Sequence, residues 1–291
     1  MKTTRTLLFL LLTSVIVAGA TDDAPLSAKF YTVNVPGAVE TWIHGINNTG
    51  VAVGAYLDKA GVCYGFVLDG KQFTKLNDPN GTCTDAYNLN PNGPVAVVGS
   101  YYSNAGKPRG FLYQNGEFTD ILGPAGATVS MANGINDQGD IVGVYIDANN
   151  AVHGFLFSGG IYTTLDVPGA ATSDATGIND AGDIVFYWVP NGGGPYNSSI
   201  CKGNTFRTIN VPGAVNGSVA TSLNSTNDIG YFWYDASGQT HSAVRRNGTV
   251  FKFDPPKAVG SYAWGINDDH EIAGGFALTN NGNVSGYAAT N

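Results

Sequence analysis

The side chains of this sequence that are best suited to chemistry are one histidine and two carboxylates, His44, Asp85 and Asp174. They occupy two nearby positions of a predicted strand that recurs along the chain every 43 to 46 residues. Repeated units stack so that equivalent positions come together, and the three side chains could then hold a metal ion or hydrogen-bond a sugar. The alternative is that variable side chains at these positions only fill gaps between the units.

Aromatic side chains occupy the same two positions, both in the copies that carry His44 and Asp85 and in the last copy of the repeat. Their flat apolar faces are candidate stacking platforms for a sugar ring. We therefore predict that the polar and aromatic side chains together form one candidate ligand-binding set at the mouth of a central channel. This set consists of Trp42, His44, Asp85, Tyr87, Asp174, Tyr262 and Trp264.

The familiar signatures of catalysis and cofactor binding are missing from the sequence. It contains no Gly-x-Ser-x-Gly elbow, no His-Glu-x-x-His motif and no phosphate-binding loop. His153 and His241 share one position of the repeat, which favours a role in the framework over one in catalysis. We therefore predict no catalytic residue, no metal site and no cofactor.

Two independent anchors define the repeat. The first is a small residue followed by Ile or Leu and then Asn, and the second is an aromatic residue that opens a strand. Both recur six times with a period of about 44 residues, which is the length of one supersecondary unit. The anchor asparagines are Asn47, Asn90, Asn136, Asn179, Asn224 and Asn267.

Each copy of the repeat predicts four short antiparallel strands. Residues 162–167 alternate like a half-buried strand, and Asn179-Asp180-Ala181-Gly182 is a hairpin turn. A four-stranded unit of this length is typical of a propeller blade, whereas the coils of a β-solenoid, the main alternative, are usually shorter and parallel.

The ends of the chain favour a closed ring. Phe30–Val35 reads as a lone strand before the first complete unit, and the last unit has only three strands. A strand left over at the start can supply the strand missing at the end, so that no long open edge remains. We therefore predict an all-β, six-bladed propeller in which Phe30–Val35 completes the last blade.

One copy of the repeat resembles a known sequence family. Gly134-Ile-Asn-Asp-Gln-Gly-Asp-Ile-Val-Gly143, followed by His153-Gly-Phe-Leu-Phe157, is similar to the HAF-type repeat of predicted bacterial extracellular proteins. The resemblance covers nearly all of residues 30–291, with departures where His is usual in the family. It implies export and repetition, and it brings no catalytic residues. The departures are Tyr64, Arg109, Asn197 and Ser285.

Three cysteines, Cys63, Cys83 and Cys201, are present. Cys63 ends a longer loop, and Cys83 lies in a connection on the same predicted face, so we predict a Cys63–Cys83 disulfide; two unpaired thiols are the alternative. Cys201 aligns with a strand position and is expected to be a buried free thiol.

Composition and charge exclude several classes of protein. Charged residues make up 12% of the chain, aromatic residues make up 11%, and 40 of the 291 residues are glycine. A disordered chain has few aromatic residues and many charged ones, so this composition excludes a disordered protein. The net charge of −8 also makes nucleic acid an unfavourable partner.

The first 20 residues have the features of an export signal. Lys2 and Arg5 precede an apolar run of about a dozen residues, which is too short to span a bilayer, and Ala18-Gly19-Ala20 is a typical cleavage site. We predict a signal peptide over residues 1–20, a flexible arm over 21–29 and the propeller over 30–291. The mature protein is then expected to be extracellular, with no membrane span. Seven Asn-x-Ser/Thr triplets also offer acceptor sites for glycans.

Regular repetition without a catalytic motif predicts a secreted, non-catalytic scaffold that binds a partner or builds extracellular structure. The expected partners are extracellular glycans or further copies of the same chain. Exchange of the closing strand between molecules would link chains head to tail into filaments. The alternatives are a polysaccharide hydrolase or lyase and a carbohydrate-binding propeller, in each case with its site at the channel mouth.

Overall fold

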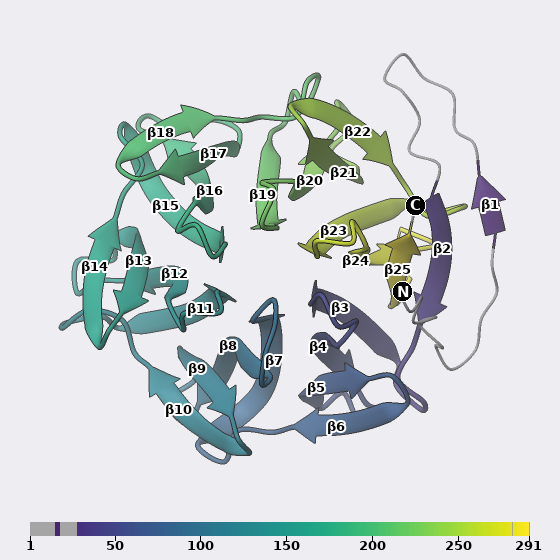
Figure 1. Ribbon diagram of the computed structural model, residues 1–291, viewed down its shortest axis with the longest axis horizontal. Helices are drawn as coiled ribbons and strands as arrows, with labels where there is room; N and C mark the ends of the chain where they lie inside the picture. The colour runs from purple at the N-terminus through teal and green to yellow at the C-terminus, as the bar shows by residue number, and fades with distance from the viewer. Residues whose placement is uncertain (1–14, 18–27, 281, 291) are drawn as a thin grey trace.

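The computed structural model describes residues 15–17, 28–280 and 282–290. All regular elements in this part of the chain are β-strands, and they form a ring of radial sheets around a central axis (Figure 1). Within the same residues, no helix is both long enough and apolar enough to cross a membrane.

Each blade is a four-stranded antiparallel sheet whose first strand lies nearest the axis (Figure 1). Blade 1 contains β3 (Glu40–Ile46), β4 (Ala52–Leu57), β5 (Cys63–Asp69) and β6 (Gln72–Leu76). Blade 2 contains β7 (Gly81–Leu89), β8 (Ala96–Ser103), β9 (Pro108–Gln114) and β10 (Glu117–Ile121). Blade 3 contains β11 (Val129–Ile135), β12 (Ile141–Ile146), β13 (Val152–Ser158) and β14 (Ile161–Leu165).

The second half of the ring has the same plan. Blade 4 contains β15 (Ala170–Ile178), β16 (Ile184–Pro190), β17 (Asn197–Lys202) and β18 (Thr205–Thr208). Blade 5 contains β19 (Ser218–Leu223), β20 (Ile229–Tyr234), β21 (Thr240–Arg246) and β22 (Thr249–Phe253). Blade 6 contains β23 (Gly260–Ile266), β24 (Ile272–Ala277), β25 (Val284–Thr290) and β2 (Ala28–Val33).

The blade count follows from strand pairing and from packing. Hydrogen bonding joins blades 3 and 4 into one eight-stranded sheet, but only through the single parallel pair Val152↔Thr172, while all other pairings in that sheet are antiparallel within a blade. Six clusters of buried apolar side chains lie between adjacent blades, one at each seam. The prediction of a six-bladed all-β propeller is therefore confirmed.

The N-terminal strand closes the ring, as predicted. β2 pairs with β25 in antiparallel register from Lys29↔Thr290 to Val33↔Gly286. The strand covers Ala28–Val33 rather than Phe30–Val35, because the backbone NH of Val35 already turns to bond the hydroxyl of Thr41. A short strand, β1 (Val15–Val17), runs along the outer edge of β2.

The predicted N-terminal segments lie mostly outside the described residues. Of the predicted signal peptide, only residues 15–17 are described, and of the predicted arm over residues 21–29, only Ala28 and Lys29 are described, both within β2. The signal peptide and the flexible arm therefore stay predictions.

The anchor asparagines account for the turn that recurs in each blade and for the hydrogen bonds between neighbouring blades. Asn179 Oδ1 accepts bonds from the backbone NH groups of Ala181 and Asp183, and its Nδ2 donates to the carbonyl of Asn224 in the next blade at 3.1 Å. An amide is needed because one end must accept and the other must donate. Asn136, Asn224 and Asn267 make equivalent bonds to the next blade.

Close packing of the inner strands explains the glycine of the first anchor in blade 3. A Cβ atom added at Gly134 would lie 2.9 Å from the Cα of Gly177 in the neighbouring blade. Any larger side chain at this position would push the two inner strands apart.

Candidate functional site

A cavity of about 410 Å³ lies on the axis, between the inner strands of the blades. Tyr196, from the loop between β16 and β17, and Tyr234, at the end of β20, both line it. The cavity therefore opens toward the face with the longer loops. Its size is within the range of about 300–1,000 Å³ that is usual for small-molecule sites.

A β-bulge in the inner strand of every blade directs one side chain toward the cavity. The register of β3 on β4 shifts between Ile43 and Gly45, so His44 has no partner across the strand pair. The same shift occurs at the equivalent residue of the other five inner strands. Bulges commonly redirect side chains beside functional sites. The bulged residues are His44, Tyr87, Asn133, Thr176, Thr221 and Trp264.

Four of the bulged residues also bridge the seam to the next blade. Asn133 Nδ2 donates to the carbonyl of Ala175 at 3.1 Å, and His44 Nδ1 lies 3.2 Å from the carbonyl of Ala86. The hydroxyls of Thr176 and Thr221 donate in the same way, at 2.8 and 2.7 Å, to Ala220 and Ala263. These residues therefore fill the gaps between blades, as the alternative interpretation expected, and line the cavity as well.

Asp174 is the buried carboxylate of the site. Its side chain accepts a bond from Asn133 Nδ2 at 2.7 Å and another from the Tyr187 hydroxyl. Only 8% of the residue is exposed. Burial disfavours the charged form and raises the pKa of Asp174 to about 7, although the two hydrogen bonds act in the opposite direction.

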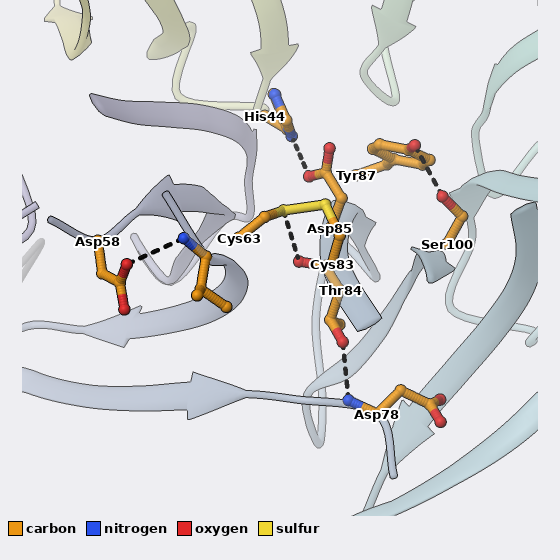
Figure 2. Close-up of a disulfide and its surroundings, with 10 residues drawn as sticks. His44, Asp58, Cys63, Asp78, Cys83, Thr84, Asp85, Tyr87 and Ser100 are labelled. Carbon is orange, nitrogen blue, oxygen red and sulfur yellow. Dashed lines mark hydrogen bonds and ion pairs between the residues drawn. A yellow bond between two sulfur atoms is a disulfide. The ribbon is translucent and has the colours of Figure 1, made fainter. Parts of the chain in front are cut away.

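Asp85 lies at the equivalent position of blade 2, where its Oδ1 is 3.0 Å from His44 Nδ1 (Figure 2). The Tyr87 hydroxyl, two residues further along β7, bonds to the hydroxyl of Ser100 at 2.8 Å (Figure 2). Burial, together with the nearby charge of Asp85, raises the pKa of Tyr87, so this hydroxyl stays protonated.

Aromatic rings form a continuous arc around most of the cavity. His44 touches Tyr87 on one side and Trp264 on the other, with centroid separations of 5.8 and 4.6 Å. Trp264 stacks on Tyr262 at 5.1 Å, and the chain of contacts continues into blades 5 and 4. There it passes through Phe232, Tyr234, Tyr196 and Tyr187.

Five of the seven predicted ligand-binding residues line the cavity: His44, Asp85, Tyr87, Asp174 and Trp264. The two others do not belong to the lining in the described part of the chain. Tyr262 stacks behind Trp264, and Trp42 is half-buried in β3.

The sequence analysis missed the lining residues that come from outside the inner strands, Tyr187, Tyr196, Phe232 and Tyr234. The sequence contains a pattern that could have identified two of these four residues. Tyr187 and Phe232 occupy a second-strand position that holds Ala55, Ser100, Val144 and Gly275 in the other blades. A large aromatic side chain, at a position where the other copies have smaller side chains, marks the two blades whose second strand also lines the cavity.

The structure joins Cys63 and Cys83 in a disulfide (Figure 2). Cys63 begins β5 of blade 1, and Cys83 lies in β7 of blade 2, two residues before Asp85. The bridge therefore fixes the strand that carries Asp85. Cys201 is unpaired and buried.

His153 and His241 lie outside the cavity, each between two aspartates. His153 Nδ1 is 2.9 Å from Asp166, and His241 Nδ1 is 2.7 Å from Asp254. In the described ranges, no group of three or more His, Cys, Asp or Glu side chains is arranged to hold a metal ion. The cavity itself presents aromatic ring faces and hydrogen-bonding side chains.

The comparisons with known proteins concern the fold. No family model matches the chain, and no curated protein matches it. A structure of SapL1 lectin in complex with α-methyl fucoside is similar, with a TM-score of 0.55 and 12% identity over 86% of this chain and 93% of that one.

Two further structures have comparable scores. AofleA from Arthrobotrys oligospora gives a TM-score of 0.53 and 13% identity over 91% of this chain and 86% of that chain. A putative TolB from Agrobacterium tumefaciens gives a TM-score of 0.54 and 15% identity over 73% of this chain and 80% of that chain. At these identities the likeness is one of fold, and it agrees with the strand pairing: the chain is a β-propeller.

Proposed function

We propose that this protein is a carbohydrate-binding propeller whose site is the axial cavity. The observation that carries the proposal is the joining, in one cavity, of an arc of aromatic rings with polar side chains, one of which, Asp174, is buried. The apolar face of a sugar ring would stack on Trp264, while its hydroxyls would bond Asp85, Asp174 and Thr221. The fold of SapL1 lectin, solved with a fucoside, supports the idea that a propeller of this shape can bind sugar.

A glycan array followed by calorimetry on the best glycans tests this proposal. Trp264→Ala is expected to weaken binding at least about fivefold, since an aromatic contact contributes about 1 kcal/mol beyond its buried area. Trp233→Ala is the matched control, because Trp233 stacks on His241 outside the cavity. Equal affinities of the two folded variants, or an array without any bound glycan, would contradict the proposal.

A polysaccharide hydrolase or lyase is the second candidate. Asp174, with its pKa raised to about 7 by burial, lines the same cavity as Asp85, and a protonated carboxyl and a carboxylate that share one cavity can serve in acid–base chemistry. Prolonged incubation with the glycans that bind, followed by mass spectrometry, separates the candidates. Products that form with the native protein but not with Asp174→Asn would favour the enzyme.

We also propose that the protein is exported, with cleavage after Ala20, and that it belongs to the HAF-type repeat family. The Cys63–Cys83 disulfide supports export, because such bonds persist in oxidising compartments. N-terminal sequencing of protein recovered from the medium is expected to begin at Thr21. Protein retained inside the cell with an intact N-terminus would contradict export.

Self-association into filaments is a further proposal, which rests on β2 as a separate closing strand. β2 of one molecule would then complete blade 6 of the next, in the register that it has within its own chain. Negative-stain microscopy of concentrated mature protein is expected to show linear particles. A strictly monomeric species at high concentration would contradict filament formation.

A further inference from the structure

We propose that the ligand of the axial cavity carries a positive charge, and that it is a sugar with a free amino group. This inference rests on the proposed carbohydrate-binding function and narrows it to one chemical class. It follows from the charge of the cavity, from the partners of its carboxylates and from the arrangement of its rings.

The cavity contains acids but no compensating strong base. Asp85 and Asp174 line it, and none of the described residues around it is Lys or Arg. His44 is the one lining side chain able to carry a positive charge, and it is paired with Asp85. Like charges repel strongly where water is scarce, so a uronic or sialic acid would be disfavoured in this cavity.

Asp174 has only uncharged partners in the structure. They are the amide of Asn133 and the hydroxyl of Tyr187. An ionised carboxylate that is almost completely buried needs a counter-charge to offset its lost hydration. An ammonium group of the ligand would supply that charge, whereas a neutral sugar would leave Asp174 uncompensated.

The cavity combines aromatic rings with carboxylates, and both kinds of group attract a cation. Tyr187, Tyr196, Tyr234 and Trp264 line the cavity together with the two aspartates. An ammonium group is attracted both to a carboxylate and to the electron-rich face of an aromatic ring, and cages of such rings bind organic cations. The same protein already uses this contact outside the cavity, where Lys252 Nζ lies 4.5 Å from the centroid of the Trp233 ring.

Binding should therefore depend on pH. The groups that face Asp174 are Tyr187 from β16, Asn133 from β11 and Tyr87 from β7, and His44 and Asp85 lie across the same cavity. Because burial raises the pKa of Asp174 to about 7, the carboxyl is largely protonated at pH 5.5. An ammonium ligand requires the ionised form, so its affinity should rise up to about tenfold per pH unit below pH 7.

Calorimetry with three oligosaccharides of equal length tests the inference directly. The probes are glucosamine trimers with free amines, their N-acetylated counterparts and galacturonate trimers. We expect the free-amine trimer to bind at least tenfold more tightly than the acetylated one at pH 7.0, where part of its amino groups are protonated, and the galacturonate trimer not to bind. Asp174→Asn should abolish the preference for the amine and retain binding of the neutral trimer. Asp69→Asn, at the exposed end of β5, is the matched control and should behave like the native protein.

The outcomes separate this inference from the proposed function. An acetylated or acidic trimer that binds as tightly as the free-amine trimer overturns the positive charge and leaves carbohydrate binding intact. Tetramethylammonium serves as a fourth probe, a cation without a sugar. If it binds while every sugar fails to bind, carbohydrate binding is overturned, and with it the amino sugar as the ligand, and only a site for organic cations remains. If no probe binds to the folded native protein, the inference is overturned. A preference for the amine that survives in Asp174→Asn overturns the role of this carboxylate.

Discussion

Asp85 and Asp174 occupy equivalent positions in two blades, yet their surroundings differ. Asp85 lies beside His44, which can carry a positive charge, whereas Asp174 is bonded to an uncharged amide and an uncharged hydroxyl. Repeat position alone was enough to predict both as candidate site residues. It could not predict which carboxylate would be uncompensated, because that depends on Asn133 and Tyr187, which reach Asp174 from two other strands.

At the same scale, His241 should make stability depend on pH. Its hydrogen bond with Asp254 is the main cause of a raised pKa, and Asp235 adds to it. Because the pKa is raised on folding, the stabilisation is fully present below the unfolded value of about 6.5 and is lost as the pH rises through the higher folded value. Native protein should therefore be more stable than His241→Gln at pH 5.5, and the difference in unfolding free energy should shrink as the pH increases.

Urea unfolding of both proteins between pH 5.5 and 8.5 measures this difference. Subtracting the two curves removes the contribution of all other titrating groups. A difference that grows with pH would contradict the assignment. Asp254→Asn is the second variant, and it should show the same reduced dependence on pH because it removes the main partner of His241.

At the scale of elements, alternating residues were enough to predict the strands and their turns, but not where an inner strand bulges. A bulge depends on the register between two strands, and His44 and Trp264 look like ordinary strand residues until that register is known. The bulge explains why the most variable position of the repeat faces the cavity. It also explains why the same residue can bond the next blade.

The anchor asparagine should be the most sensitive position of each turn. Asn179→Ala removes an acceptor for two backbone NH groups and a donor to the neighbouring blade, and two of these three hydrogen bonds are buried. We expect a loss of about 2–3 kcal/mol, or about 4–12 °C in the melting temperature. Calorimetric melting would measure the loss, with Asn204→Ala as the control at an exposed turn position. Equal melting temperatures for the two variants would show that the amide does not join the blades.

At the scale of the whole molecule, counting repeats was enough to predict six blades and the closure of the ring. The boundary of the closing strand was displaced by two residues. The pattern places the turn after Val35, whereas the bond from Val35 to Thr41 ends the pairing at Val33. The N-terminal strand contributes three buried apolar residues to the ring: Ala28, Phe30 and Val33.

Removal of residues 21–35 should therefore destabilise the entire ring. Blade 6 would lose its outer strand, and the Phe30 ring would no longer pack on Tyr287. We expect a loss of at least about 3 kcal/mol, on the scale of a buried Phe→Ala change. A synthetic peptide covering residues 28–35, added in excess, should restore the melting temperature, while a scrambled peptide should not. A truncated protein that melts like the full chain would show that closure by β2 contributes little.

The pairing of Lys29 with Thr290 also decides when the protein can finish folding. Strands so far apart in the chain must overcome a large loop-closure entropy before they meet, and such contacts form slowly. β25 follows all the other described strands in the chain, so β2 has no partner in blade 6 until those strands have been synthesised. If the chain is moved across a membrane from its N-terminus, β2 emerges long before its partner exists. Throughout that interval the residues that the folded ring buries, Ala28, Phe30 and Val33, would be exposed to solvent.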